Sequence, residues 1–324
     1  MRLTLPLLSV AAAVALGAVG PRAGAADVDP GLPEYASVGG VAGDLVGVGS
    51  DTLNEAMTFW GAGFQEVYAN VNPSYDPKGS GAAPTALIEG TAVVGPMSRE
   101  MKAEEIQKFE KKFGYKPTAV RVCLDALAVY VNKDNPVPSL TLAQVDAMFS
   151  STRKQGAPAD ISTWGQVGLT GDWASLPISL YGRNSTSGTY TYFKEHVLSK
   201  GDYKSTVKEQ AGSSAVVNGV TADRAGVGYS GIGYRTPGVR AVPIAGKDGK
   251  PYDASEANVY SGAYPISRGL LVYVNKAPGQ ALPTLAREFL RYVLSKQGQE
   301  LVKSKAGFVP LTAKMAAEER AKLD

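Results

Sequence analysis

The stretch "AVRVCLDALAVYVNKD", residues 119–134, is a long run of apolar and β-branched residues that ends in a Val-Asn-Lys segment and an aspartate. A second run, "PISRGLLVYVNK" at residues 265–276, reaches the same Val-Asn-Lys ending. Their composition predicts two buried strands. If each strand passes between two lobes, the chain crosses twice, and one lobe is built from two separate segments.

A double crossing predicts one discontinuous and one continuous lobe. Lobe I would consist of residues 26–120 together with residues 264–324, and lobe II of residues 121–263. The length of 324 residues also suggests about two domains. Two sequential domains would need one linker, and no linker rich in proline, glycine and serine lies near the middle of the chain.

The rest of the chain alternates short β-rich segments with helical patterns. "DLVGVG", "AVVGP" and "PISLYG" each precede such a pattern. This alternation predicts an α/β architecture with largely parallel strands. We also expect a hairpin or loop at the surface at residues 246–253, and C-terminal helices that stop at Gly307.

The first residues have the pattern of an export signal. Arg2, an apolar run and the small-residue site at Ala23 and Ala25 predict a cleaved signal peptide over residues 1–25. The apolar run is shorter than the roughly 18 residues of a membrane span, and no later stretch is long enough, so we expect no membrane insertion. No cysteine follows the run to carry a lipid anchor. The mature protein is therefore expected in the periplasm or outside the cell.

Composition argues against several classes of protein. The formal net charge is +3 and falls to +1 when Arg2 and Arg22 leave with the signal peptide, which gives no support for a nucleic-acid partner. Cys123 is the only cysteine and His196 the only histidine. The chain can therefore form no internal disulfide, and the usual zinc, copper and haem ligand sets are missing. We expect Cys123 to be a buried small hydrophobe and expect no cofactor.

Three segments share one order of residues: a strand, then glycine with serine or threonine, then a helix. They are "GVGSDTLNEAM", "KGSGAAPTALIEG" and "GRNSTSGTYTYF". A helix N-terminus leaves backbone N–H groups unpaired and carries about half a positive charge, so it can hold an anion. A single loop of this kind is most often a plain N-cap. Three of them favour a shared anion site.

The third loop adds a charge, because Arg183 lies four residues before Ser187. The planar guanidinium can donate two hydrogen bonds to neighbouring oxygens of a tetrahedral oxyanion. The alternative is a surface arginine that pairs with a carboxylate. A nucleotide cradle is not indicated, because "GSGAAPTA" lacks the Gly-Lys-Ser/Thr ending and no G-x-G-x-x-G follows a strand.

The chain resembles the periplasmic phosphate-binding proteins of the phosphate ABC transporter (PstS type). The matching blocks are "GSDTL", "KGSG", "GPMSREM", "RNSTSGT", "GVGYSGIGY" and "YPISRGLLVYVNK", and they span roughly residues 40–310. The resemblance implies a type II periplasmic-binding-protein fold, with two α/β lobes joined by two crossover strands and the ligand in the cleft. It also implies a monomer that binds inorganic phosphate with high affinity and delivers it to an inner-membrane ABC permease, without being an enzyme.

Carried over position by position, the resemblance gives a set of phosphate ligands. These are Thr52, Leu53, Ser80, Arg183, Ser187, Gly188 and Thr189. Leu53 and Gly188 would donate through backbone amides alone, and Arg183 would supply the charge. Further candidates of lower rank are Ser50, Asp51, Ser98, Arg99 and Asp125.

Arg99 departs from the family pattern. Better-known members have an aspartate at this position, which accepts the proton of bound phosphate and helps to exclude sulfate. Asp51 and Asp125 are the nearest candidates for a replacement acceptor. Arg99 could reach into the cleft as a second cation or pair with Asp125, and the sequence favours neither arrangement.

Two other functions remain open from the sequence. A phosphoesterase could use Ser50 or Ser187 as nucleophile and His196 as base, but His196 lies seven residues beyond Thr189, roughly 10 Å along the helix. A receptor for sulfate, molybdate or a phosphonate would use the same donors. Binding of phosphate and sulfate across pH, together with a phosphatase assay, would separate these functions.

Overall fold

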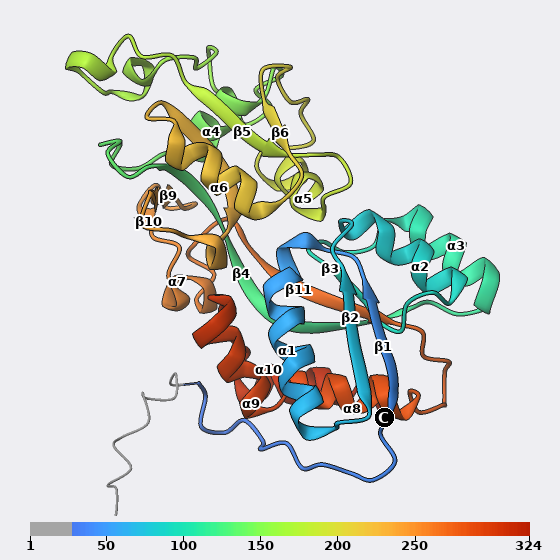
Figure 1. Cartoon of the computed structure of the whole chain (residues 1–324). Coiled ribbons are helices and arrows are strands. Elements are labelled where there is room, and N and C mark those ends of the chain that lie inside the picture. The colour runs from blue at the N-terminus through green and yellow to red at the C-terminus, as the bar shows by residue number, and fades with distance from the viewer. Residues whose placement is uncertain (1–27) are drawn as a thin grey trace, which may run out of the picture.

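A computed structural model describes residues 28–324, so the expected signal peptide at residues 1–25 lies outside the described residues. Figure 1 shows two lobes linked by two long strands, β4 (Thr118–Asn132) and β11 (Ser267–Val274). We call β4 and β11 the crossing strands. They carry the two apolar runs that predict the double crossing.

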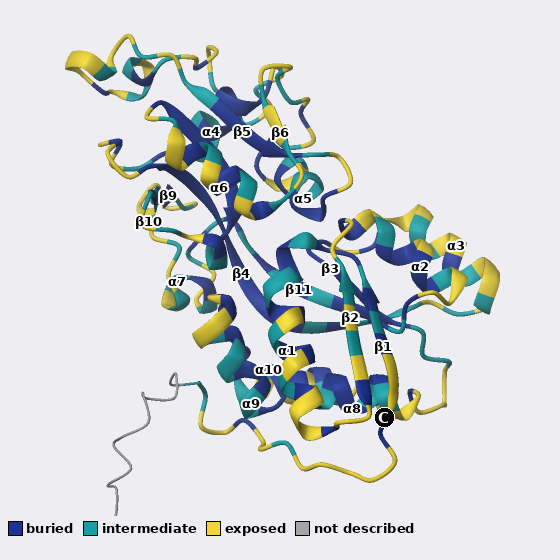
Figure 2. Cartoon of the chain, viewed as in Figure 1, coloured by how far each residue is buried: buried dark blue, intermediate teal, exposed yellow. Residues whose placement is uncertain are grey.

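The crossing strands belong to one mixed sheet with the strand order β3-β11-β4-β7-β5-β6, and β8 also pairs with β4. The first half of β4 pairs with β11, and its second half pairs with β7 and β8. Each half of β4 therefore belongs to a different lobe. Figure 2 shows the second half of β4 as continuously buried, which explains its nearly unbroken apolar sequence.

The first lobe contains the segments before β4 and after β11. Its strands are β1 (Gly43–Val48), β2 (Val71–Asp76) and β3 (Gly95–Met97). Its helices are α1 (Asn54–Val67), α2 (Ala83–Glu89), α3 (Ala103–Phe113), α8 (Thr284–Val293), α9 (Lys296–Leu301), η6 (Val302–Ala306) and α10 (Ala313–Arg320).

The segment between the crossing strands forms the second lobe. Its strands are β5 (Ser179–Arg183), β6 (Lys208–Gln210), β7 (Gly226–Gly231), β8 (Val239–Ala241), β9 (Ile244–Ala245) and β10 (Pro251–Tyr252). Its α-helices are α4 (Leu142–Phe149), α5 (Gly188–His196), α6 (Ser213–Ala222) and α7 (Glu256–Tyr260). Short 3₁₀ turns are η3 (Trp164–Val167), η4 (Gly171–Trp173) and η5 (Ile232–Tyr234).

The first lobe is held together by an aromatic core between α1 and α8. Phe64 is fully buried and makes edge-on or tilted contacts with four rings. Trp60, one helical turn earlier, is also buried and donates from Nε1 to the carbonyl of Gly298 at 2.9 Å. The apolar stripe of α1 therefore fixes this helix against the C-terminal helices, and with it the loop at its start.

The structure confirms most predicted elements and corrects one. The hairpin β9–β10 surrounds the predicted turn, and Gly307 ends η6 with a left-handed φ of 69°. The expectation of largely parallel strands is wrong for the crossing region, where β3, β11, β4 and β7 are all antiparallel neighbours. The reason is topological, because a chain that leaves one lobe and returns must cross in opposite directions. Parallel pairs occur inside each lobe, as in β1–β2 and β5–β7.

The exact lobe boundaries stay a prediction, although the two crossings lie where the sequence predicts them. Cys123 is fully buried in β4, as expected, and burial raises the pKa of its thiol well above the ordinary value. Within residues 28–324, every helix is too short or too polar to cross a bilayer.

Candidate functional site

Three loops that contain the predicted ligands lie at the starts of helices. The turn η1 (Asp51–Leu53) follows β1 and leads into α1, and η2 (Ser80–Ala82) follows β2 and leads into α2. The third loop follows β5, and its Ser187 is the N-cap of α5. The first two loops belong to one lobe and the third to the other, so a shared site requires the lobes to approach each other.

The structure brings four hydroxyl groups of these loops and the nearby β3 end together. Thr52 and Thr189 lie 2.8 Å apart between their Oγ1 atoms. Ser80 Oγ lies 3.2 Å from Ser98 Oγ, which is itself 3.5 Å from Thr189 Oγ1. We call these side chains, Thr52, Ser80, Ser98 and Thr189, the hydroxyl cluster. All four residues are buried, and the cluster joins the two lobes.

Gly188 is part of the same contact. A Cβ atom added to Gly188 would lie 2.3 Å from Ser80 Oγ and 2.7 Å from Ser98 Oγ. The first helical residue of α5 therefore packs directly on the loops of the other lobe, and only a residue without a side chain fits there. Ser187 holds this start in place, because its Oγ accepts hydrogen bonds from the amides of Thr189 and Tyr190 at 3.1 and 3.4 Å.

Arg183 lies at the end of β5 and is only 2% exposed. Its Nη1 donates to Ser213 Oγ at 2.8 Å and lies 3.2 Å from Asp51 Oδ2, and its Nη2 donates to the carbonyl of Ala211. Its Nε has no partner among the described residues although it is buried. Burial lowers the pKa of Arg183, and the Asp51 carboxylate acts in the opposite direction. A buried guanidinium with an unused donor is suited to an anion.

Asp51, in the first lobe, also contacts the second lobe. Its Oδ2 accepts from the amide of Ser213 at the start of α6, and the backbone carbonyls of Asp51 and Thr52 both accept from the Tyr234 hydroxyl. Arg183 therefore also pairs with a carboxylate, which was the alternative that the sequence left open. Arg183 is buried rather than on the surface, and its carboxylate partner comes from the opposite lobe.

Two further predicted residues lie in the first loop. Ser50 is buried, and its Oγ has no partner in the described chain. Leu53 is fully buried, and its amide donates to the carbonyl of Ser50 at 3.1 Å. The Leu53 amide is thus already used inside the turn. To bind an anion as well, it would have to donate to the anion and to the Ser50 carbonyl at the same time.

Arg99 has a different partner from the one expected. Its two Nη atoms each donate to the Glu105 carboxylate of α3 at 2.7 Å. The pairing of Arg99 with Asp125 is therefore wrong. Asp125 instead pairs with Arg268, whose Nε and Nη2 donate to Asp125 Oδ2 at 3.0 and 2.8 Å. Glu105 occupies both Nη atoms of Arg99, whereas its buried Nε has no partner among the described residues and Arg99 lines the cavity described below, so Arg99 stays a candidate of lower rank.

This placement of Arg99 gives a testable prediction. We expect Arg99→Gln to bind phosphate within about twofold of the wild type, because Glu105 already holds both Nη atoms of Arg99. The unfolding midpoint should fall, because Glu105 loses its bidentate partner in a largely buried position. Calorimetric titration and a thermal melt measure the two effects separately. A loss of affinity with an unchanged midpoint would place Arg99 in the site.

Arg268 is the site residue that the sequence reasoning missed. It stands in β11 directly opposite Asp125 in β4 in the antiparallel register. Its Nη1 donates to the carbonyl of Ser98 at 2.8 Å and its Nη2 to Thr189 Oγ1 at 3.0 Å, so it touches the hydroxyl cluster. The available signal was an acidic residue in the middle of the first apolar run, Asp125, and a basic residue inside the second, Arg268.

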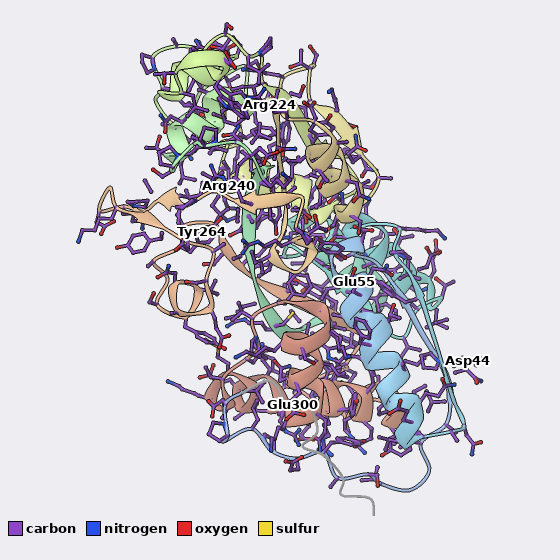
Figure 3. The ribbon with its side chains drawn as sticks, turned by 60° about the vertical axis from the view of Figure 1, so that its left-hand side comes forward. Asp44, Glu55, Arg224, Arg240, Tyr264 and Glu300 are labelled. Atoms are coloured by element: carbon purple, nitrogen blue, oxygen red, sulfur yellow. The ribbon has the colours of Figure 1, made fainter. Side chains whose placement is uncertain are left out.

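A cavity of about 590 Å³ lies beside Arg268 between the lobes. Its lining includes Lys102, Arg121, Tyr192, His196 and Arg268. Arg268 thus contacts both this cavity and Thr189 of the hydroxyl cluster. Figure 3 shows side chains filling the region where the lobes meet, with Glu55 of α1 near it.

The geometry does not favour an acid–base pair of serine and histidine. Ser187 is the N-cap of α5 and His196 ends this nine-residue helix, so about 13 Å of helix separates them. The His196 ring stacks on Tyr192 with 4.0 Å between centroids, and its Nδ1 lies 3.0 Å from the Tyr192 carbonyl. In the part of the chain that the structure describes, no three His, Cys, Asp or Glu side chains gather as a metal site.

Comparisons with known proteins identify a family and several similar chains. A family model described as a PBP superfamily domain matches residues 35–297. The chain is 53% identical over 311 residues to the phosphate-binding protein PstS of Pseudomonas aeruginosa, which covers 96% of each chain. It is 31% identical over 255 residues to protein SphX of Synechococcus elongatus, with 78% of this chain and 72% of SphX covered.

Solved structures with a similar fold have lower sequence identity. An ABC-type phosphate transport receptor from Vibrio cholerae has a TM-score of 0.65 and 21% identity, covering 82% of this chain and all of that chain. A high-affinity periplasmic phosphate-binding protein, PfluDING, solved with bound phosphate, has a TM-score of 0.66 and 17% identity, covering 86% of this chain and 93% of that chain. At these sequence identities the similarity shows only that the folds are alike.

Proposed function

We propose a function from one premise: this chain belongs to the PBP superfamily and, within it, to the phosphate-binding proteins of the PstS type. The protein binds inorganic phosphate between its two lobes and delivers it to an ABC permease. The observation that carries this proposal is the hydroxyl cluster, in which donors of both lobes meet. Arg183 adds a buried guanidinium that contacts Asp51, the neighbour of Thr52, and has no partner for its Nε among the described residues.

The proposed ligands are the residues that the three loops bring together: Thr52, Ser80, Arg183, Gly188 and Thr189, with Leu53 and Ser187 at the helix starts. Helix N-termini and hydroxyl groups suit a tetrahedral oxyanion because they offer donors from several directions without a metal. Arg183 provides the positive charge, and Asp51 neutralises it when the anion is absent. The lower-ranked candidates Ser50 and Ser98 would complete the lining of the proposed phosphate site.

The two-lobed fold suggests how binding is coupled to transport. A ligand that bonds to both lobes favours the arrangement in which the lobes are closed. Here the contacts of Thr52 with Thr189 and of Asp51 with Arg183 already connect the lobes. The closed form would dock as a monomer on an inner-membrane permease and release phosphate when it opens. The predicted signal peptide supports a periplasmic location.

We also propose that the chain is a binding protein and not a phosphoesterase, since the Ser187 hydroxyl caps α5 and His196 lies at the other end of that helix. One observation favours a second candidate function, a receptor of broader oxyanion specificity. The position where better-known family members have a proton-accepting aspartate is Arg99, which turns to Glu105.

A titration of the purified protein tests this function. We expect saturable binding of one phosphate per chain, displacement by arsenate, and a higher unfolding midpoint with phosphate, because a ligand that binds only the folded state stabilises it. A chromogenic phosphate monoester should not be turned over. Phosphate binding too weak to shift the midpoint, or hydrolysis at an enzymatic rate, would contradict the proposal.

A further inference from the structure

One side chain of the second lobe holds the backbone of a loop in the first lobe. The Tyr234 hydroxyl donates to the carbonyl oxygens of Asp51 at 2.8 Å and Thr52 at 3.1 Å. Tyr234 ends η5, which lies between the crossing strands in the chain, whereas Asp51 and Thr52 form the turn η1 in front of α1. This contact therefore exists only while the two lobes lie together.

The position of the Tyr234 ring is fixed by its surroundings. Gly233, the residue before it, packs so closely on the first lobe that an added Cβ atom would lie 2.1 Å from the carbonyl oxygen of Ala306. The Tyr234 ring is 7% exposed and packs edge-on against Phe308, with 6.4 Å between the ring centroids. The hydroxyl is thus held against η1 by packing on both sides of the residue.

The Tyr234 hydroxyl keeps its proton at neutral pH. Burial raises the pKa of Tyr234 above its ordinary value, and the carboxylates of Asp51 and Glu55 raise it further. A carbonyl oxygen can only accept, so the hydroxyl must be the donor in both contacts. It has one hydrogen, which the two neighbouring carbonyls share.

A bond to a carbonyl also sets the direction of the amide that follows it. A peptide unit is planar and trans, so its N–H points away from its C=O. The carbonyl of Asp51 belongs to the same peptide unit as the amide of Thr52, and the carbonyl of Thr52 to that of Leu53. With both carbonyls turned to Tyr234, these two amides point to the opposite side. The Leu53 amide already donates to Ser50 inside the turn, so the Thr52 amide is the better donor for an anion.

We propose, on the basis of the phosphate-binding function above, that Tyr234 is a positioning residue of the anion site. Its hydroxyl holds η1 with the Thr52 amide directed at the anion, and it does so from the opposite lobe. The first loop then reaches its binding geometry when the lobes close, and Tyr234 slows the release of bound phosphate. It acts through the backbone of η1 and not on the anion itself.

The test is Tyr234→Phe, which keeps the ring against Phe308 and removes only the hydroxyl. We expect phosphate to bind about three- to tenfold more weakly, because two buried carbonyls lose a donor. In stopped-flow experiments the loss should appear as faster dissociation, with an association rate within about twofold of the wild type, since the contact forms only on closure. The unfolding midpoint without phosphate should stay at the wild-type value.

A control and a second measurement separate positioning from packing. Tyr181→Phe removes a tyrosine hydroxyl that donates to Asp223 inside the second lobe, and it should leave the phosphate dissociation rate unchanged. In amide NMR spectra of the wild type, phosphate should move the Thr52 proton downfield, as expected for a donor to an anion. In Tyr234→Phe this shift should be smaller, while the shift of the Gly188 amide in the other lobe stays the same.

The outcomes distinguish the two proposals. A wild-type protein that binds no phosphate would refute the phosphate function, and the role of Tyr234 with it. If the wild type binds phosphate but Tyr234→Phe keeps its dissociation rate or its Thr52 shift, only the role of Tyr234 is refuted. A lower unfolding midpoint without phosphate and an unchanged affinity would assign the hydroxyl to folding and also overturn the inference. If Tyr234→Phe does not fold, as judged by circular dichroism, the wild-type Thr52 amide decides, because a signal that phosphate leaves in place would contradict the inference.

Discussion

Replacing Arg183 with alanine should weaken phosphate binding by roughly 2–5 kcal/mol, about 30-fold to several thousand-fold. Arg183 is the buried cation of the second lobe, and its Nε is unused in the structure. Without it, an anion would enter a buried site with one guanidinium fewer, and Asp51 would lose its charged partner at 3.2 Å. Both effects oppose anion binding. Isothermal titration with phosphate measures the loss.

The fold should survive this change, because Asp51 is about one-fifth exposed and can be hydrated when Arg183 is absent. A matched control is Arg224→Ala, which removes an exposed arginine stacked on Trp173 in the same lobe. Figure 3 shows Arg224 far from the Glu55 end of α1. Arg224→Ala should keep wild-type affinity. A folded Arg183→Ala variant that binds phosphate within about threefold of the wild type would refute the role of Arg183.

The sequence was sufficient for the architecture because the crossing strands have an unusual composition. Most positions of the second half of β4 are buried on both sides, so its sequence is an unbroken apolar run. The Gly-Ser/Thr loops were recognisable for a related reason, because the loops of the two lobes approach so closely that only small residues fit there. Gly188 against Ser80 is the clearest case.

The direction of the long side chains could not be predicted from the sequence. Arg99 follows Ser98, a member of the hydroxyl cluster, yet its tip turns to Glu105, which also accepts from the amide of Lys102 at the start of α3. That choice depends on where α3 begins in space. Arg268 was hidden for a different reason, since its partner Asp125 is more than one hundred residues away in the chain. Only the antiparallel register of β4 and β11 places them opposite each other.

Gly188→Ala should be the second strongest substitution, and its effect should fall on closure of the lobes. The residue is the first of α5, where alanine is compatible with the backbone, so the second lobe should fold normally. In the closed arrangement, however, the new methyl group would lie 2.3 Å from Ser80 Oγ of the other lobe. Overpacking of this kind costs about 1–3 kcal/mol, which corresponds to a loss of affinity of roughly fivefold to more than one-hundredfold.

Two measurements assign this loss to closure. Small-angle X-ray scattering of the wild type should show a smaller radius of gyration with saturating phosphate, whereas Gly188→Ala should change less at the same phosphate concentration. Gly39→Ala is the matched control, because a methyl group there would meet no atom within 4 Å and should leave affinity and compaction unchanged. If Gly188→Ala binds and compacts like the wild type, then α5 does not meet the Ser80 loop when the protein holds its ligand. The proposed ligand set would then lose the contact that joins its two halves.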